Sequence, residues 1–171
     1  MVGLARLAFD NDEHRRQLEL AATTDPLTGL GNRAGLARRL RDVEGQHISV
    51  LYVDLDGFKQ VNDTYGHGVG DHVIVAAGQR LVSLLRETDA VFRVGGDEFV
   101  VVCRDISDAT SSDAAEQIAS RIVGRLGAPF RVDDVLVTVG ASGGVALRSS
   151  DEHATELLRR ADLALLRAKR D

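Results

Sequence analysis

Hydrophobic positions follow helical and strand spacings in alternating stretches along most of the chain. Apolar residues recurring every three or four positions predict helices at 33–43, 69–86, 112–127 and about 154–169, with a short helix and loop over 57–70. Short β-rich runs predict strands at 48–53, 91–94, 98–103, 135–139 and 142–147. We expect two hairpins, one around Gly95-Gly96 and one joining the last two strands. Helices interleaved with hairpins predict an α+β fold whose central sheet is mixed, mainly antiparallel and flanked by helices.

The first 24 residues form a helical pattern of their own. Its seam positions recur with a 3-4 spacing and are Leu4, Leu7, Asn11, His14, Leu18 and Ala21. This spacing is typical of a two-stranded coiled coil, and an amphipathic helix packed on its own domain is an equal alternative. Pro26 and the turn-rich stretch that follows it end the helix. We therefore expect an N-terminal signalling helix, 1–24, and a second part, 25–171.

Composition indicates one soluble globular domain. The 171 residues are 44% hydrophobic and 27% charged, and no apolar run approaches the roughly 18 residues that span a bilayer. We expect no direct membrane insertion, although a longer parent protein could be membrane-associated. The net charge of −5 argues against binding a nucleic acid polymer but not against binding a nucleotide. Cys103 is the single cysteine and cannot form an internal disulfide, which favours the cytoplasm.

Two acidic pairs follow or precede predicted strands. Asp54 and Asp56 come directly after the run 48–53, and Asp97-Glu98 follow the glycine pair. If these segments are neighbours, Asp54, the Leu55 carbonyl and one of the second pair could hold magnesium, which prefers oxygen ligands. Taken alone, each acidic pair is more often a turn than a metal site, because aspartate stabilises turns.

A resemblance to the GGDEF domains of diguanylate cyclases goes further than these patterns. The five residues 95–99 read Gly-Gly-Asp-Glu-Phe, letter for letter the signature of that family. Four more segments resemble the family in the same order, namely 25–33, 54–63, 66–71 and 161–169. The resemblance implies a palm-like nucleotidyl cyclase fold and the condensation of two GTP molecules into cyclic di-GMP, with release of two pyrophosphates.

The resemblance also implies a role for each matched residue. Asp54, the Leu55 carbonyl, Asp97 and Glu98 would hold two Mg²⁺ ions per active site, with Mn²⁺ as a substitute. Asp97, or alternatively Glu98, would accept the 3′-hydroxyl proton. The remaining residues would bind substrate: Phe58, Lys59 and Lys169 at the phosphates, Asn62 and Asp71 at guanine, and His67 in the glycine-rich loop. Lys59 could instead be a solvated lysine, Asn62 a turn cap, and Asp71 the N-cap of the following helix.

The family resemblance further implies partners and regulation. Each domain would bind one GTP, so the active enzyme would be an antiparallel homodimer controlled by the helix 1–24. Arg86 and Asp89 match the Arg-x-x-Asp pattern of an inhibitory site for cyclic di-GMP, although such i,i+3 charge pairs are also common at helix ends. No upstream sensor precedes Met1, so we expect an excised part of a longer protein. The family's usual Gly-Arg-Asn after the last helix is missing, and Leu166 replaces a usual tyrosine.

Three other functions remain open from the sequence. The first is a catalytically weak GGDEF module that binds GTP or cyclic di-GMP and signals without making product. The second is a dimerisation module that acts mainly through the helix 1–24. The third is a cyclase that uses ATP, which Asp71 disfavours because adenine lacks the paired N1–H and N2–H₂ donors of guanine.

Overall fold

A four-stranded antiparallel sheet forms the centre of the molecule. The computed structural model describes residues 17–104, 111–149 and 151–170. The strand order is β2-β3-β1-β6, with β1 at Ile48–Asp56, β2 at Ala90–Arg93, β3 at Glu98–Arg104 and β6 at Gly140–Leu147. All three strand pairings are antiparallel, and an isolated bridge between Gly31 and Phe92 adds a parallel contact at the edge. The predicted α+β class is confirmed, and so is the hairpin around Gly95-Gly96.

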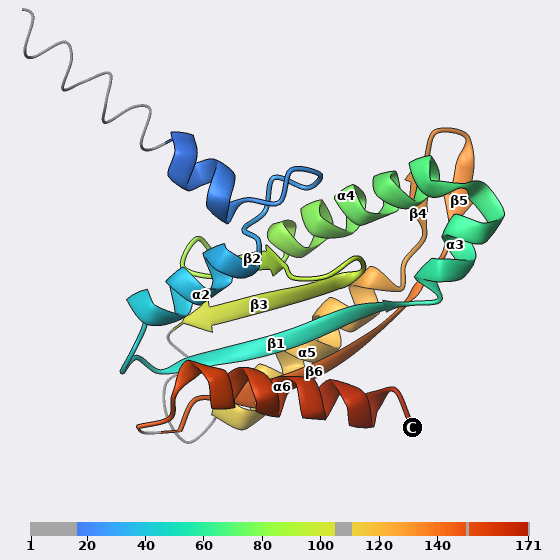
Figure 1. Ribbon diagram of the computed structural model, residues 1–171. Coiled ribbons are helices and arrows are strands. Elements are labelled where there is room, and N and C mark those ends of the chain that lie inside the picture. The colour runs from blue at the N-terminus through green and yellow to red at the C-terminus, as the bar shows by residue number, and fades with distance from the viewer. Residues whose placement is uncertain (1–16, 105–110, 150, 171) are drawn as a thin grey trace, which may run out of the picture.

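Helices cover both faces of this sheet (Figure 1). On one face α4 (His67–Ser83) and α5 (Ser111–Leu126) pack with Leu51, Val53 and Leu55 of β1. On the other face α2 (Arg33–Asp42) and α6 (Ala154–Ala168) pack with Ile48 and Val50. Because side chains alternate along a strand, Asp54 points to the same face as Val50, toward α6.

The predicted hairpin between 135–139 and 142–147 is wrong. The strand β5 (Val135–Val137) pairs with β4 (Phe130–Val132) in a separate two-stranded sheet, and β6 pairs with β1 instead. The turn of the small hairpin is Asp133-Asp134, where Asp133 adopts a positive φ of 50°. A three-residue strand beside Pro129 is too short to give an alternating pattern, so sequence periodicity missed β4.

The region after β1 contains two helices separated by one glycine. The helix α3 (Phe58–Tyr65) ends at Gly66, whose φ of 85° reverses the chain, and α4 then begins at His67, two residues before its predicted start. The N-cap of α4 is therefore Gly66. The alternative that Asp71 caps this helix is wrong, because Asp71 lies in its second turn.

The described part of the N-terminal segment is helical over 17–23 and extends away from the sheet (Figure 1). Leu18 is 59% exposed and Leu20 is 64% exposed, so these side chains are not buried against the domain. Of the predicted seam positions, Leu18 and Ala21 are described and both are exposed, whereas Leu4, Leu7, Asn11 and His14 lie outside the described residues. Across the described ranges, no helix is both long and apolar enough to span a membrane.

Candidate active site

The two acidic segments meet at one end of β1 and β3. Asp54 lies directly opposite Glu98 in the strand register, and the Leu55 amide donates a hydrogen bond of 3.2 Å to the Asp97 carbonyl. Asp54 is only 9% exposed, although the strand ends at the rim of the sheet. The structure therefore brings together the segments whose proximity the sequence argument required.

Like charges at this rim repel one another. Burial raises the pKa of the Asp97 carboxyl, and the nearby Asp54 carboxylate raises it further. The Lys169 ammonium lies 2.6 Å from Asp54 Oδ1. Burial lowers the pKa of Lys169, but its hydrogen bond and ion pair with Asp54 outweigh that effect and the net direction is upward. A single lysine thus faces a group of carboxylates.

The oxygen donors at this rim suit a cation that also binds another molecule. Within the described ranges, no three side chains of His, Cys, Asp or Glu converge closely enough to hold a metal ion by themselves. Magnesium commonly takes only one or two carboxylates and completes its shell with phosphate oxygens and water. The donors present, led by Asp54 and Asp97, fit such a partial shell, and Asp54 already accepts a cation in the form of Lys169.

The absence of a side chain at Gly95 leaves room for the Glu98 carboxylate to pack against the turn. A Cβ at Gly95 would overlap Glu98 Oε2, whereas nothing lies within 4 Å of the corresponding position at Gly96. The Glu98 carboxylate therefore lies against Gly95, and the Gly96 side of the turn is open. A side chain at residue 95 would displace Glu98 from the rim.

The chain turns sharply between the acidic strand end and α3. Gly57 adopts a φ of 76° and is the N-cap of that helix, so Phe58 and Lys59 form its first two residues. Their amide groups have no partner within the helix and are available to an anion. The Phe58 ring packs against the core, whereas the Lys59 side chain is exposed. The backbone here, rather than the Phe58 ring, is placed to meet a phosphate.

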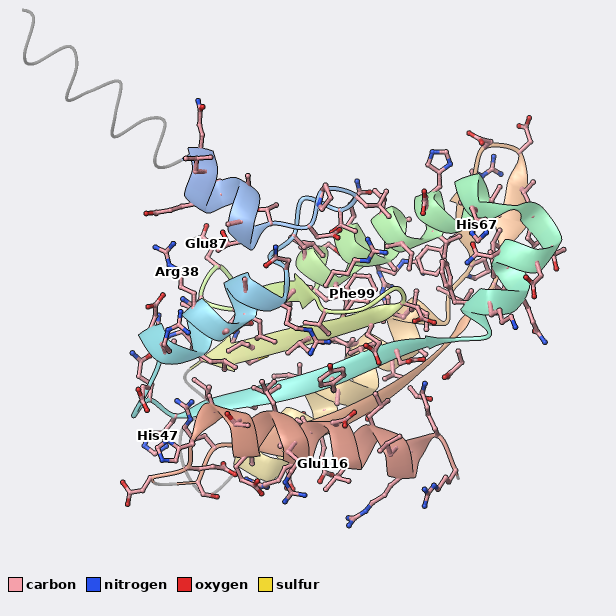
Figure 2. The ribbon with its side chains drawn as sticks, viewed as in Figure 1. Arg38, His47, His67, Glu87, Phe99 and Glu116 are labelled. Carbon is pink, nitrogen blue, oxygen red and sulfur yellow. The ribbon has the colours of Figure 1, made fainter. Side chains whose placement is uncertain are left out.

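The predicted guanine residues lie at the junction of α3 and α4. A Cβ at Gly70 would overlap the Asn62 side-chain amide, so Asn62 lies directly over Gly70 and next to the following residue, Asp71. Asp71 and His67 are exposed, and His67 is the first residue of α4, directly after the glycine that separates the two helices (Figure 2). This junction leaves a carboxylate and an amide accessible on the surface.

The chain matches a known protein family over most of its length. Residues 22–171 match the family described as "Diguanylate cyclase, GGDEF domain". This chain belongs to the GGDEF domain family. The palm-like fold expected from the resemblance is consistent with its structural neighbours, which are solved GGDEF domains.

Relatives of this GGDEF domain carry different names. The chain is 38% identical over 170 residues to the cyclic di-GMP phosphodiesterase PdeR of Escherichia coli, covering 94% of this chain and 25% of PdeR. It is 39% identical over 175 residues to the diguanylate cyclase TpbB of Pseudomonas aeruginosa, covering 97% of this chain and 38% of TpbB. The chain therefore spans between a quarter and two fifths of the length of these two proteins.

Solved GGDEF structures superpose closely on the chain. Diguanylate cyclase SiaD of Pseudomonas aeruginosa, in complex with its activator SiaC, gives a TM-score of 0.77 at 36% identity, covering 98% of this chain and 67% of SiaD. The coiled coil and GGDEF domain of DgcB from Caulobacter crescentus, in complex with c-di-GMP, gives a TM-score of 0.79 at 29% identity. The match covers 99% of this chain and 95% of the DgcB chain.

Sequence reasoning missed residues that surround Glu98 in this GGDEF domain. A cavity of about 450 Å³ lies between α2 and α6 and is lined by Arg33, Tyr52, Glu98 and Asp162 among others. Burial and the Glu98 carboxylate raise the pKa of Tyr52, while Arg33 acts in the opposite direction. The position of Tyr52, two residues before Asp54 on the same strand face, could have indicated this contact.

The Arg-x-x-Asp residues lie at the opposite end of β3. Arg86 and Asp89 line a cavity of about 530 Å³ together with Arg104 and Arg121. The Asp89 carboxylate accepts hydrogen bonds from the backbone amides of Arg86 and Arg104, at 3.1 and 3.2 Å. No ion pair joins the side chains of Arg86 and Asp89, both of which are described. The Arg104 guanidinium donates to Gln46 Oε1 at 2.6 Å, so Arg104 contributes its backbone amide to Asp89 rather than a free charge. The cavity therefore combines the arginines Arg86 and Arg121 with one carboxylate that the backbone already holds.

Proposed function

We propose that this domain is a diguanylate cyclase that condenses two GTP molecules into cyclic di-GMP and releases two pyrophosphates. The observation that carries the proposal is the placement of Asp54 opposite Glu98, with Asp97 bonded to Leu55 beside them, on an intact family signature. Each 3′-hydroxyl attacks the α-phosphorus of the other GTP. Two phosphodiester bonds form, and two bonds to pyrophosphate break.

Asp54, the Leu55 carbonyl, Asp97 and Glu98 are the donors that would hold two Mg²⁺ ions, or Mn²⁺ in their place. Divalent ions in such a site neutralise a triphosphate and polarise the phosphorus under attack. Asp97 is our first choice for the base that accepts the 3′-hydroxyl proton, because a raised pKa brings a carboxylate closer to the working pH. Glu98 is the alternative base.

The phosphates and the base occupy the segment after β1. The free amides of Phe58 and Lys59 face the β- and γ-phosphates, and Lys59 adds a positive charge as pyrophosphate leaves. Lys169 supplies a second positive charge at the same end. The Asp71 carboxylate accepts hydrogen bonds from guanine, the Asn62 amide donates or accepts, and His67 orders the glycine-rich junction between them. A carboxylate that faced adenine would lack donors, so GTP is favoured over ATP.

The product requires two domains. Because each domain binds one GTP, the two active sites face one another in an antiparallel homodimer. The helix that includes residues 17–23 is then the stalk that controls this pairing, which agrees with the exposure of Leu18 and Leu20. An upstream sensor would act through the stalk, and the substrate GTP places the reaction in the cytoplasm.

The cavity with Arg86 and Asp89 is the site of product inhibition in this proposal. Guanidinium groups bind phosphate or the O6/N7 edge of guanine, and a carboxylate accepts hydrogen bonds from the opposite edge. Arg121 is a second arginine that lines the same cavity. The cavity therefore has the charge expected of a site for a cyclic dinucleotide.

A product assay tests the proposed reaction. Incubation with GTP and Mg²⁺, followed by chromatography, should yield one cyclic di-GMP for every two pyrophosphates. Linear pppGpG alone, or unchanged GTP, would contradict the proposal. A parallel incubation with an equal concentration of ATP should leave ATP unchanged.

The second candidate is a GGDEF module that binds GTP or cyclic di-GMP without making product. The observation that favours it is the relative PdeR, 38% identical, which is named for phosphodiesterase activity rather than synthesis. Calorimetric titration with a non-hydrolysable GTP analogue and with cyclic di-GMP separates the two candidates. Binding of both ligands without turnover would establish the module and exclude the cyclase.

A further inference from the structure

The glycine turn that precedes Asp97 is held from outside by two arginines. Arg93 donates from Nε and Nη2 to the Gly96 carbonyl at 3.2 and 2.8 Å. Arg33 donates from Nη2 to the Val94 carbonyl at 2.9 Å. The carbonyls on either side of Gly95 are therefore both fixed by guanidinium groups. Inside the turn, the Val94 and Gly95 amides donate to the Glu98 carbonyl at 3.0 and 3.4 Å. Because two consecutive glycines restrict the backbone little by themselves, the arginines add a second support from outside.

Arg93 is itself anchored on a distant part of the sequence. Its Nη1 lies 3.1 Å from both carboxylate oxygens of Asp25, and both side chains of this ion pair are 15% exposed. Thr28 donates to Asp25 Oδ2 from its amide at 2.9 Å and from its hydroxyl at 2.7 Å. Burial raises the pKa of Asp25, but the hydrogen bonds from Thr28 and Arg93 outweigh it and lower the pKa. The Asp25 carboxylate is thus a fixed, charged anchor.

The same anchor segment is tied to the end of the N-terminal helix. The Asn32 side-chain amide donates to the Ala22 carbonyl at 3.0 Å and to the Thr24 carbonyl at 3.2 Å. Thr24 and Gly31 form an isolated antiparallel bridge. One continuous set of hydrogen bonds therefore runs from the helix end, through the segment 24–32, to the glycine turn.

We propose that Asp25, Arg93 and Arg33 are positioning residues that hold the glycine turn so that Asp97 and Glu98 face Asp54. None of the three needs to touch the reacting atoms, and their effect passes through the Val94 and Gly96 carbonyls. The inference rests on the proposed function for its catalytic consequence, but not for its structural one. It also gives the stalk a physical route to the active site, because the anchor segment is shared.

The forked guanidinium of Arg93 allows a role in positioning the turn to be separated from a role in stabilising the fold. A lysine at position 93 keeps the charge and can still pair with Asp25, but one ammonium group cannot hold Asp25 and the Gly96 carbonyl in the same rigid geometry. Arg93→Lys should therefore keep most of the fold stability and lose the support of the turn. Asp25→Asn removes the anchor charge and should have the same local effect with a larger loss of stability.

Hydrogen–deuterium exchange of the whole metal-free chain tests the inference without any reaction. In Arg93→Lys, amides of the turn and of its partner Leu55 should exchange about tenfold faster or more, while amides in α5 keep the wild-type rate. Glu156→Gln is the matched control, because it breaks the exposed ion pair of Glu156 with Arg159 on α6. That variant should leave the turn unchanged.

Two further readouts connect the turn to the chemistry. Mn²⁺ binding with a GTP analogue should weaken by roughly tenfold in Arg93→Lys, and kcat should fall by about 10- to 100-fold with an unchanged KM for GTP. Wild-type exchange at the turn in both Arg93→Lys and Asp25→Asn would overturn the inference. If wild-type protein makes no cyclic di-GMP, the proposed function fails, yet faster exchange in the variants still supports the positioning role.

Discussion

The two ends of β3 carry opposite charge: carboxylates gather at its beginning and arginines at its end. At its beginning, Glu98 lies beside Asp54 and Asp97, and one ammonium group, that of Lys169, contacts this group of carboxylates. At its end, Arg86 and Arg121 line a cavity with the carboxylate of Asp89, whose oxygens already accept hydrogen bonds from the backbone amides of Arg86 and Arg104. At the first end three carboxylates lie close together and Arg33 and Arg93 donate to backbone carbonyls of the glycine turn, whereas at the second end arginines outnumber the one carboxylate.

This difference indicates what each end can bind. Lys169 and Arg93 relieve part of the repulsion among the carboxylates, and added cations would relieve more, so the first end suits metal ions that carry a polyphosphate. The surplus guanidinium groups at the second end suit an anion that enters without metal. Both ligands would contain guanosine phosphates, but they would be held by opposite charges. The predictions below test that division.

The largest expected effect comes from removing the central carboxylate. Asp54→Asn should lower the rate of cyclic di-GMP synthesis by roughly 10²- to 10³-fold or more, because it removes a proposed metal ligand and its charge at the transferred phosphate. Product formation is followed by chromatography at saturating Mg²⁺. Asp113→Asn, an exposed acid at the start of α5, is the control and should keep the wild-type rate. A fully active Asp54→Asn protein would remove the acidic end from the mechanism.

Base selection should depend on Asp71. Asp71→Ala should reduce the preference for GTP over ATP by about 100-fold, because the guanine N1–H and N2–H₂ donors lose their acceptor. Competition between the two nucleotides in one assay measures the ratio directly. Asp63→Ala removes a neighbouring exposed acid from α3 and should leave the preference unchanged. An equal loss in both variants would point to general charge rather than base recognition.

The cavity with Arg86 at the end of β3 should bind cyclic di-GMP and not take part in binding the substrate. Arg86→Ala should weaken cyclic di-GMP binding by about 10- to 100-fold and raise product yield, since charge-assisted hydrogen bonds are lost. Titration calorimetry with cyclic di-GMP measures the affinity, with Arg41→Ala on α2 as the control. An unchanged binding isotherm would exclude this cavity as the product site.

The smallest effect concerns stability without metal. Burial and Asp54 raise the folded pKa of Asp97 above its unfolded value, so its contribution to stability is present at low pH and is lost as pH rises through the folded pKa. Asp97→Asn should therefore raise Tm at neutral pH, by about 2–4 °C for each 1 kcal/mol of repulsion relieved. The gain should vanish below the ordinary carboxyl range. Scanning calorimetry in the presence of a chelator, at several pH values, measures the Tm of both proteins. A rise in Tm that persists in acid would contradict the idea that charge repulsion at Asp97 destabilises the metal-free protein.

The sequence predicted the elements of the fold correctly where the hydrophobic pattern extends over many residues. The buried run at 48–53 and the glycine-centred hairpin predicted β1, β2 and β3, whereas the pairing of β1 with β3, which joins the two acidic segments, was only a condition of the argument. It failed at β4, because three residues cannot display alternation, and the failure moved β5 into the wrong pair. The strands β4 and β5 lie outside the central sheet, but the same error misplaced β6, which pairs with β1 so that Asp54 lies opposite Ser142.

The rest of the site could not be read from spacing. Arg93 and Asp25 are 68 residues apart in sequence, and nothing in either local pattern indicates that they form an ion pair. The ion pair of Lys169 with Asp54 likewise depends on how α6 packs across β6, where a Cβ at Gly144 would overlap the α6 backbone. Tertiary contacts of this kind are set by packing rather than by local preference.

Counting bound metal ions tests the central claim most directly. Mn²⁺ titration by electron paramagnetic resonance, in the presence of a non-hydrolysable GTP analogue, should give two ions per wild-type chain and at most one in Asp54→Asn. Asp113→Asn should match wild type. An equal count of ions in wild type and Asp54→Asn would contradict the account, because the acidic end of β3 would then not be where the cations and the nucleotide meet.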